Sequence, residues 1–368
     1  MVLSSKYGRT STGNPETREH GPGGCYISNV GICVLGLVFI VSLTSVGLIV
    51  HHTGKRQTTQ AGDTSKKYLT YRDYWYNFDQ CQTWASSGRL SNHFEKTLVT
   101  TTWLADQLSD PALSIQKIRI LDTWGKKLYK QDHIPNALFF DHTRCVNSSR
   151  LFPRNLPDQG CFEEYLQSLG IHADTEVILY DRYSRRPSAR AWWLLRLYGH
   201  KRVSVLDGGL KKWKADGHQT TTVLPSVETS ELQVDFDPVL IRDFDAMSLN
   251  YDYNIEQVID ARLEEFFTGE ITEMGLRPGH IPGSINVPYS EMFNSDETFK
   301  SANELRRLFM EAGIDLNRPV VATCTTGMKA TGTAIAFHLM GKIIPIYHGA
   351  WTEWSQRAKS DRIATGKN

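Results

Sequence analysis

The sequence predicts two tandem α/β domains, each a mainly parallel β-sheet flanked by helices, preceded by one N-terminal transmembrane helix. Short apolar runs alternate with helical patterns along most of the chain, which indicates strand–helix units on a parallel sheet. An internal repeat indicates that this arrangement occurs twice. Four landmarks recur in the same order and at nearly constant spacing: Ile120-Leu121-Asp122 with Val258-Ile259-Asp260, His133 to Ala137 with His280 to Ser284, Val177 to Asp181 with Val320 to Cys324, and Asp207 to Trp213 with His348 to Trp354.

The N-terminal part of the chain predicts a membrane anchor. Residues 30–50 are apolar and uncharged over a length that crosses a bilayer as one helix. A cleaved signal peptide and a buried core helix are the alternatives, but the run is long for a signal peptide and no small-residue cleavage site follows it. Residues 1–29 are expected to be a disordered tail, and residues 51–97 a polar stalk with an aromatic-rich extension.

The orientation of this anchor rests on charge. Lysines and arginines are more frequent just after the apolar run than before it, which favours a cytosolic catalytic part. A reactive thiol also suits a reducing compartment. The tripeptide Asn147-Ser148-Ser149 is a glycosylation sequon, which only a lumenal domain could use, and it favours the other orientation. We expect a single-pass membrane protein with a cytosolic catalytic part.

Two domains follow the stalk. We place the first at residues 98–217 and the second at residues 238–360. Residues 218–237 have no helical periodicity and are typical of a linker. The net charge of +1 gives no indication of a nucleic-acid partner. The six cysteines lack metal-site spacing and are too few for a disulfide scaffold in a chain this long: Cys25, Cys33, Cys81, Cys145, Cys161 and Cys324.

The stretch from Val320 to Ala330 contains the candidate catalytic residue, Cys324. An apolar run predicts a buried strand, Cys324 stands at its end, and a polar loop with Gly327 leads into a helix that stops at Gly341. A thiol below a helix N-terminus faces unpaired N–H groups, which favour the nucleophilic thiolate. A buried structural cysteine is the alternative.

Two families use such a loop. Tyrosine phosphatases have the signature Cys-x5-Arg, because a planar guanidinium clamps the phosphate, and Ala330 stands at that arginine position. The loop more closely resembles the six-residue active loop of the rhodanese family. Within that family it is similar to the mercaptopyruvate type, Cys-Gly-Ser/Thr-Gly-Val-Thr-Ala. Three positions depart from that pattern: Thr325, Met328 and Lys329.

The resemblance extends to the tandem domains and implies a function. It implies a sulfurtransferase that moves sulfane sulfur from thiosulfate or 3-mercaptopyruvate to a thiol or cyanide through a persulfide on Cys324, with no metal or organic cofactor. The amides of Thr325, Thr326, Gly327, Met328 and Lys329 would stabilise the anionic sulfur. Asp181 stands at the matching position of the first domain, which is therefore expected to be non-catalytic.

The resemblance also assigns roles outside the loop. It implies that Asp122 and His133 assist the Thr326 hydroxyl, although capping roles for both are the alternative. Trp351 and Phe266 would line the pocket, and core packing is the alternative for Trp351.

Donor recognition is where the sequence departs from the family. The mercaptopyruvate type binds its donor with two arginines, and these positions fall on Phe266 and near Glu273 here. The thiosulfate type resembles Cys-Arg-Lys-Gly, with cations where Thr325 and Thr326 stand. Lys329 would have to supply the anion contact. A non-catalytic or sulfur-sensing binding module tethered to a membrane is the rival hypothesis.

Overall fold

The computed structural model describes residues 96–109 and 117–367, all within one compact unit of the chain. The predicted tail, the predicted span at residues 30–50 and nearly all of the stalk lie outside these residues. Within the described part of the chain, no helix is long and apolar enough to cross a membrane.

The first domain contains a five-stranded sheet in the order β1-β5-β4-β2-β3, with every pair parallel. Its central strands are apolar and buried on both faces, as parallel strands between helices must be. The elements are β1 (Leu98–Val99), α2 (Thr101–Ser109), β2 (Ile118–Asp122), α4 (Lys126–Tyr129), β3 (Leu138–Phe139), α5 (Gln159–Ser168), β4 (Glu176–Tyr180), α6 (Arg186–Leu197), β5 (Val203–Leu206) and α7 (Gly209–Ala215).

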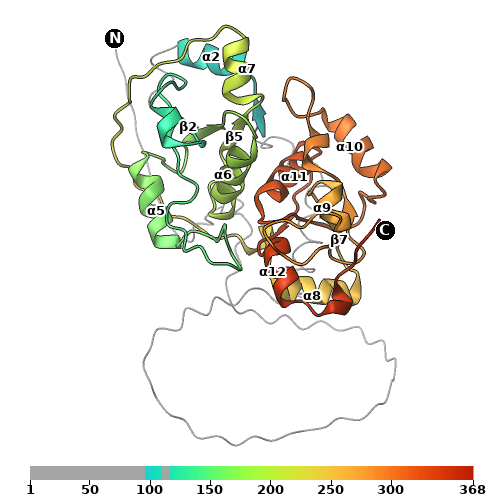
Figure 1. Ribbon diagram of the computed structural model, residues 1–368. Coiled ribbons are helices and arrows are strands. Elements are labelled where there is room, and N and C mark those ends of the chain that lie inside the picture. The colour runs from blue at the N-terminus through green and yellow to red at the C-terminus, as the bar shows by residue number, and fades with distance from the viewer. Residues whose placement is uncertain (1–95, 110–116, 368) are drawn as a thin grey trace, which may run out of the picture. The chain divides into compact units, whose positions relative to one another are not determined.

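The second domain repeats this topology with the order β6-β10-β9-β7-β8, again all parallel. The tandem α/β prediction is thereby confirmed (Figure 1). The elements are η1 (Pro238–Leu240), β6 (Ile241–Arg242), α8 (Phe244–Tyr253), β7 (Gln257–Asp260), α9 (Glu264–Thr268), β8 (Ile285–Asn286), η2 (Tyr289–Met292), α10 (Ala302–Glu311), β9 (Val320–Thr323), α11 (Met328–Leu339), β10 (Ile346–Tyr347), α12 (Ala350–Arg357) and η3 (Ser360–Arg362).

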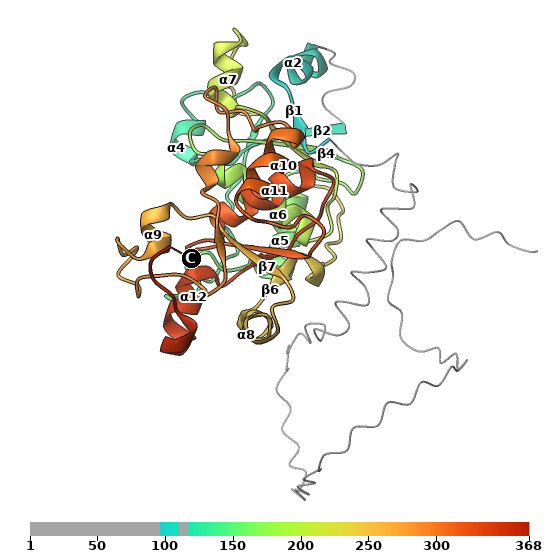
Figure 2. The ribbon, with the colours of Figure 1, turned by 90° about the vertical axis from the view of Figure 1, so that its right-hand side faces the viewer.

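Helices α6 and α11 join the two domains. They lie side by side in both views of the ribbon (Figure 1 and Figure 2). Both helices are almost fully buried, and their apolar residues belong to one continuous core cluster that extends into both domains. Because each of these helices follows the central strand of its own sheet, the packing brings the carboxyl ends of β4 and β9 toward a common region.

The segment between the domains follows the surface of the first domain. Residues 218–237 form no helix or strand, apart from an isolated bridge that Thr221 makes with His133. The backbone amides of Asp235 and Asp237 donate to carbonyls at the end of α6, at Tyr198 and Leu197. The linker therefore has fixed partners although it has no secondary structure of its own.

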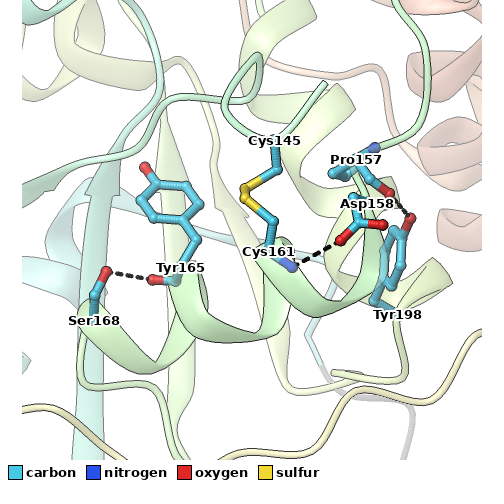
Figure 3. Close-up of a disulfide and its surroundings, with 7 residues drawn as sticks. All are labelled: Cys145, Pro157, Asp158, Cys161, Tyr165, Ser168 and Tyr198. Carbon is cyan, nitrogen blue, oxygen red and sulfur yellow. Dashed lines mark hydrogen bonds between the residues drawn. A yellow bond between two sulfur atoms is a disulfide. The ribbon is translucent and has the colours of Figure 1, made fainter. Parts of the chain in front are cut away.

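A disulfide joins Cys145 to Cys161, which the sequence analysis did not anticipate (Figure 3). Cys161 lies in the first turn of α5, where its amide donates to the capping carboxylate of Asp158. The bond closes a loop with a sequence separation of 16 residues. Cys324 is the free cysteine of the described residues.

Candidate active site

Cys324 lies where the sequence predicts it, directly after β9 and before α11. The residue is buried, with 1% of its surface exposed. Its carbonyl accepts a hydrogen bond from the Trp351 amide at 2.8 Å, and the next carbonyl, of Thr325, accepts one from the Thr352 amide at 3.0 Å. These bonds fix the start of the loop to the first turn of α12.

Gly327 ends the loop in a conformation that favours glycine. It precedes α11 with a φ of 79°. A Cβ atom at this position would lie 3.3 Å from the His348 carbonyl oxygen, a very close approach. The loop therefore turns tightly below the helix N-terminus, where the first amides of α11 have no partner within the helix.

The first domain contains a counterpart of this turn that holds a carboxyl group. Asp181 follows β4 and is buried at the start of α6. Its carboxylate accepts hydrogen bonds from the Arg185 amide at 3.0 Å and from the Ser188 hydroxyl at 2.8 Å. Burial raises the pKa of Asp181, and the hydrogen bonds from Ser188 and Arg185 act in the opposite direction because they favour the charged form. The duplicated turn thus directs hydrogen-bond donors at a carboxyl group in the first domain, and Cys324 occupies the matching position in the second.

Arg190, from α6, brings a cation to the Cys324 loop. Its side chain is buried, with 2% exposed. Nη2 donates to the Arg154 carbonyl at 2.9 Å, and the guanidinium lies 4.8 Å from the ring centre of Trp193. Nη1 has no hydrogen-bond partner among the described residues and would lie 3.7 Å from a Cβ atom at Gly327. Burial lowers the pKa of Arg190 to about 10, and the charge of Cys324 acts in the opposite direction.

A carboxylate lies on another side of the same loop. The Thr325 hydroxyl donates a short hydrogen bond to Glu273. Glu273 is half-buried and precedes the β8 region. The segment where the family resemblance implies a donor-binding arginine therefore presents a negative charge to the loop.

A cavity of about 150 Å³ is lined by residues of both domains, and the carbonyl of one of them, Asn155, lies 3.5 Å from Arg190 Nη2. Its walls include Phe152 and Asn155 from the first domain and Arg242 and His348 from the second. The His348 ring stacks on Phe152 at 5.6 Å, and its Nε2 lies 3.1 Å from the Asn155 side-chain oxygen. Burial and the charge of Arg190 lower the pKa of His348 to about 3, so that the His348 ring is neutral at neutral pH.

The other loop residues are more open. Thr326, Met328 and Lys329 are half-buried, and neither the Thr326 hydroxyl nor the Lys329 ammonium has a hydrogen-bond partner or ion pair within the described residues. Lys329 is therefore available at the loop, but its role as the anion contact stays a prediction.

Asp122 and His133 make their contacts within the first domain and the linker that follows it. The Asp122 carboxylate pairs with Arg182 at 2.8 Å, fully buried. The two His133 ring nitrogens lie 2.8 Å and 3.0 Å from the carbonyls of Tyr129 and Val223. In the described part of the chain no hydrogen bond joins either residue to the Cys324 loop, so the assistance to Thr326 stays a prediction.

Phe266 and Trp351 do not line the cavity between the domains. The Trp351 indole is buried, donates to the Arg277 carbonyl at 3.0 Å and stacks against Arg262 at 4.7 Å. The Phe266 carbonyl accepts from Arg262 at 3.2 Å. Both residues therefore pack around the buried pair of Arg262 and Asp260, and their role as pocket walls stays a prediction.

Comparisons with known proteins place this geometry in a family. The model of the Rhodanese-like domain matches residues 100–216 and 244–357. Rat 3-mercaptopyruvate sulfurtransferase is 35% identical over 282 residues, which are 73% of this chain and 95% of the rat protein. Thiosulfate sulfurtransferase of Cricetulus griseus is 33% identical over 288 residues, which are 74% of this chain and 97% of that protein.

A solved structure gives the same result. SseA from Escherichia coli, a 3-mercaptopyruvate sulfotransferase with the rhodanese fold, superposes with a TM-score of 0.61 at 30% identity, over 70% of this chain and 99% of SseA. The chain belongs to the rhodanese-like family, and within it to the two-domain sulfurtransferases.

Sequence reasoning missed Arg190 and the contact of Glu273. A signal for Arg190 was present, because an arginine between Ala189 and Ala191 interrupts the apolar face of a helix that must be buried. The signal for Glu273 was weaker. The sequence showed that the donor-binding arginine of the mercaptopyruvate type is absent near this position, but it did not show that the Glu273 carboxylate contacts Thr325.

Proposed function

We propose that the protein transfers sulfane sulfur from thiosulfate or 3-mercaptopyruvate to a thiol or cyanide through a persulfide on Cys324. The thiolate forms a bond to the outer sulfur of thiosulfate, the bond between the two donor sulfurs breaks, and sulfite leaves with the electron pair. With 3-mercaptopyruvate the C–S bond breaks instead, and the enolate takes up a proton to give pyruvate. The acceptor then attacks the outer sulfur, and Cys324 returns to the thiolate.

The observation that carries this proposal is the duplicated turn at Asp181 and Cys324. Amides at the start of α6 hold the Asp181 carboxylate, which supports a matching set of donors for an anionic sulfur at the start of α11. Such donors stabilise a thiolate and a persulfide anion alike, so the same loop serves both half-reactions.

Arg190 would bind the anionic group of the donor. A buried guanidinium N–H without a partner is costly, and an oxyanion beside Gly327 would satisfy it with a charge-assisted hydrogen bond. The Arg190 pKa of about 10 leaves the guanidinium cationic at neutral pH. In this proposal the first domain has no nucleophile but supplies the positive charge of the site.

The test is a donor comparison on the purified full-length protein. Thiosulfate or 3-mercaptopyruvate is supplied with cyanide or a reduced thiol, and thiocyanate, sulfite or pyruvate is measured. We expect turnover with wild type, a gain of one sulfur atom on Cys324 after donor alone, and loss of both in Cys324→Ser. Circular dichroism of that variant checks the fold. Turnover retained by folded Cys324→Ser would exclude the persulfide mechanism, and no turnover by wild type would favour a binding module.

We also propose that residues 30–50 anchor the protein in a membrane as a single span. The support is the uncharged apolar run and the charged residues that follow it, Lys55 and Arg56. Sedimentation of the chain with membranes after alkaline carbonate washing is the expected result. Release into the supernatant would argue against an integral anchor.

A further inference from the structure

The loop between Cys145 and Cys161 carries two features that point to an oxidising compartment. The first is the disulfide itself, with Cα atoms 5.7 Å apart (Figure 3). Disulfides persist in secretory and extracellular compartments and are reduced in the cytosol, apart from transient catalytic and sensing pairs. Neither cysteine belongs to the site around Cys324, so a catalytic disulfide does not account for this one.

The second feature is an accessible sequon in the same loop. Asn147-Ser148-Ser149 is the one Asn-x-Ser/Thr tripeptide of the 368 residues. Asn147 is exposed, and its side-chain amide makes no hydrogen bond within the described residues. The Ser149 hydroxyl accepts from the Phe152 amide at 3.1 Å, which places the tripeptide at the start of a surface turn.

We propose that Asn147 is an N-glycosylation site and that the two domains face the lumen of a secretory compartment or the cell exterior. The Asn147 Nδ2 forms a bond to the anomeric carbon of a lipid-linked oligosaccharide and loses a proton, and the lipid pyrophosphate leaves with the electron pair. The thiols of Cys145 and Cys161 lose two protons and two electrons to a protein disulfide, which becomes a dithiol. This inference does not depend on the sulfur chemistry of Cys324.

This orientation is opposite to the one that charge alone favours. The lysines and arginines within residues 51–67 exceed those before residue 30 only slightly: Lys55, Arg56, Lys66 and Lys67 against Lys6, Arg9 and Arg18. Large domains can translocate despite such a bias. The disulfide and the sequon do not depend on the distribution of lysines and arginines. The disulfide reports the redox state of the compartment, and the sequon, once used, reports access to the glycosylation machinery.

The oxidising environment is compatible with a free Cys324. The other two cysteines of the described residues are bonded to each other, which leaves Cys324 no partner among them. Cys324 is also 1% exposed, so that large oxidants do not reach it directly. A disulfide in one domain and a working thiol in the other can therefore exist in the same folded chain.

The glycan is tested on the full chain, expressed in cultured cells with a secretory pathway. Digestion with a peptide N-glycosidase is expected to lower the apparent mass of wild type in a single step. Asn147→Gln and Ser149→Ala remove the shift, whereas Ser149→Thr keeps it.

A reporter variant, Asn147→Gln with Asp296→Thr, makes the exposed Asn294 a sequon. A shift in the reporter but not in wild type would overturn the Asn147 site, and no shift in either would overturn the lumenal orientation.

The disulfide is tested on the same cells without a reductant. Denatured protein is treated with a maleimide mass tag before and after reduction. Two additional tags are expected after reduction in wild type and none in the double variant Cys145→Ser, Cys161→Ser. An equal number of tags before and after reduction would show two free thiols and overturn the proposal of an oxidising compartment.

Discussion

Arg190 is the residue on which donor affinity should depend. Removal of a cation that hydrogen-bonds a charged ligand weakens binding by about 1.5–3 kcal/mol, so Arg190→Gln is expected to lower kcat/KM for thiosulfate about tenfold to a hundredfold. Arg190→Lys should recover part of the loss, because it keeps the charge without the forked geometry. The measurement is steady-state kinetics over a range of ionic strength.

Arg186→Gln is the matched control for that prediction. Arg186 begins the same helix but is exposed. Its substitution should leave kcat/KM within twofold of wild type. Equal kinetics for folded Arg190→Gln and Arg186→Gln would remove Arg190 from the donor site.

We expect Glu273 to weaken donor binding, whereas Arg190 strengthens it. The Glu273 carboxylate accepts from Thr325 at the loop, where it would repel an anionic donor. Glu273→Gln keeps a hydrogen-bond acceptor and removes the charge, so the KM for thiosulfate, a dianion, is expected to fall a few-fold, and the KM for 3-mercaptopyruvate to fall less. Glu270→Gln, exposed in the same segment, is the control. A KM that stays constant or rises would show that Glu273 has no electrostatic effect on donor binding.

At the scale of elements, the packing of α11 against η2 depends on Gly332. A Cβ at Gly332 would lie 2.0 Å from a ring carbon of Tyr289, whose side chain is buried. Gly→Ala inside a helix normally stabilises by up to about 1 kcal/mol. Here overpacking reverses the sign, and Gly332→Ala is expected to lower the free energy of unfolding by about 1–3 kcal/mol.

Urea unfolding followed by circular dichroism measures that change. Gly125→Ala is the control, because Gly125 has an extended backbone with a φ of −160° and no atom within 4 Å of a Cβ. It should change the free energy of unfolding little. A stabilised Gly332→Ala variant would mean that Tyr289 moves aside at no cost.

The elements also show what a sequence can predict. The strand, Cys324, Gly327 and the helix that follows are contiguous, so local patterns suffice to place them. The duplication was visible because four short sequence motifs recur in both halves with similar residues and in the same order. Arg190 reaches the loop only because α6 packs against α11, and that contact depends on the whole arrangement of two domains. The pairing of Cys145 with Cys161 likewise requires three-dimensional proximity, which spacing alone does not give.

At the scale of the whole molecule, the interface between the domains holds the site together. Arg185 pairs with Glu297 at 3.1 Å, and the Asp207 carboxylate accepts from the Phe299 amide at 2.9 Å. The Thr97 hydroxyl lies 2.6 Å from His338 Nδ1. Since Arg190 and Cys324 belong to different domains, a change in this interface alters the distance between the guanidinium and the thiol.

His338 makes this interface sensitive to acid. Burial and the charge of Arg196 lower the pKa of His338 to about 3, whereas an unfolded histidine titrates near about 6.5. The stability it contributes is therefore present above about pH 6.5 and is lost as the pH falls toward 3, because only the unfolded chain binds the proton. At about pH 5 the loss from this residue alone is about 2 kcal/mol.

We therefore expect the free energy of unfolding to fall between about pH 7.5 and about pH 5, with a slope that decreases by one proton in His338→Asn. Asn keeps an acceptor for Thr97 and does not titrate in this range. The difference in slope between wild type and the variant therefore reports the titration of His338 alone, even where the variant is less stable at every pH. Burial also lowers the pKa of His142 to about 4, of His348 to about 3 and of His200 below its ordinary value, and these histidines should maintain the remaining slope. Urea titrations of both proteins at several pH values measure the two curves. If the curves run parallel from neutral to acid pH, His338 is protonated equally in the folded and unfolded chains, and the acid sensitivity of the interface has another source.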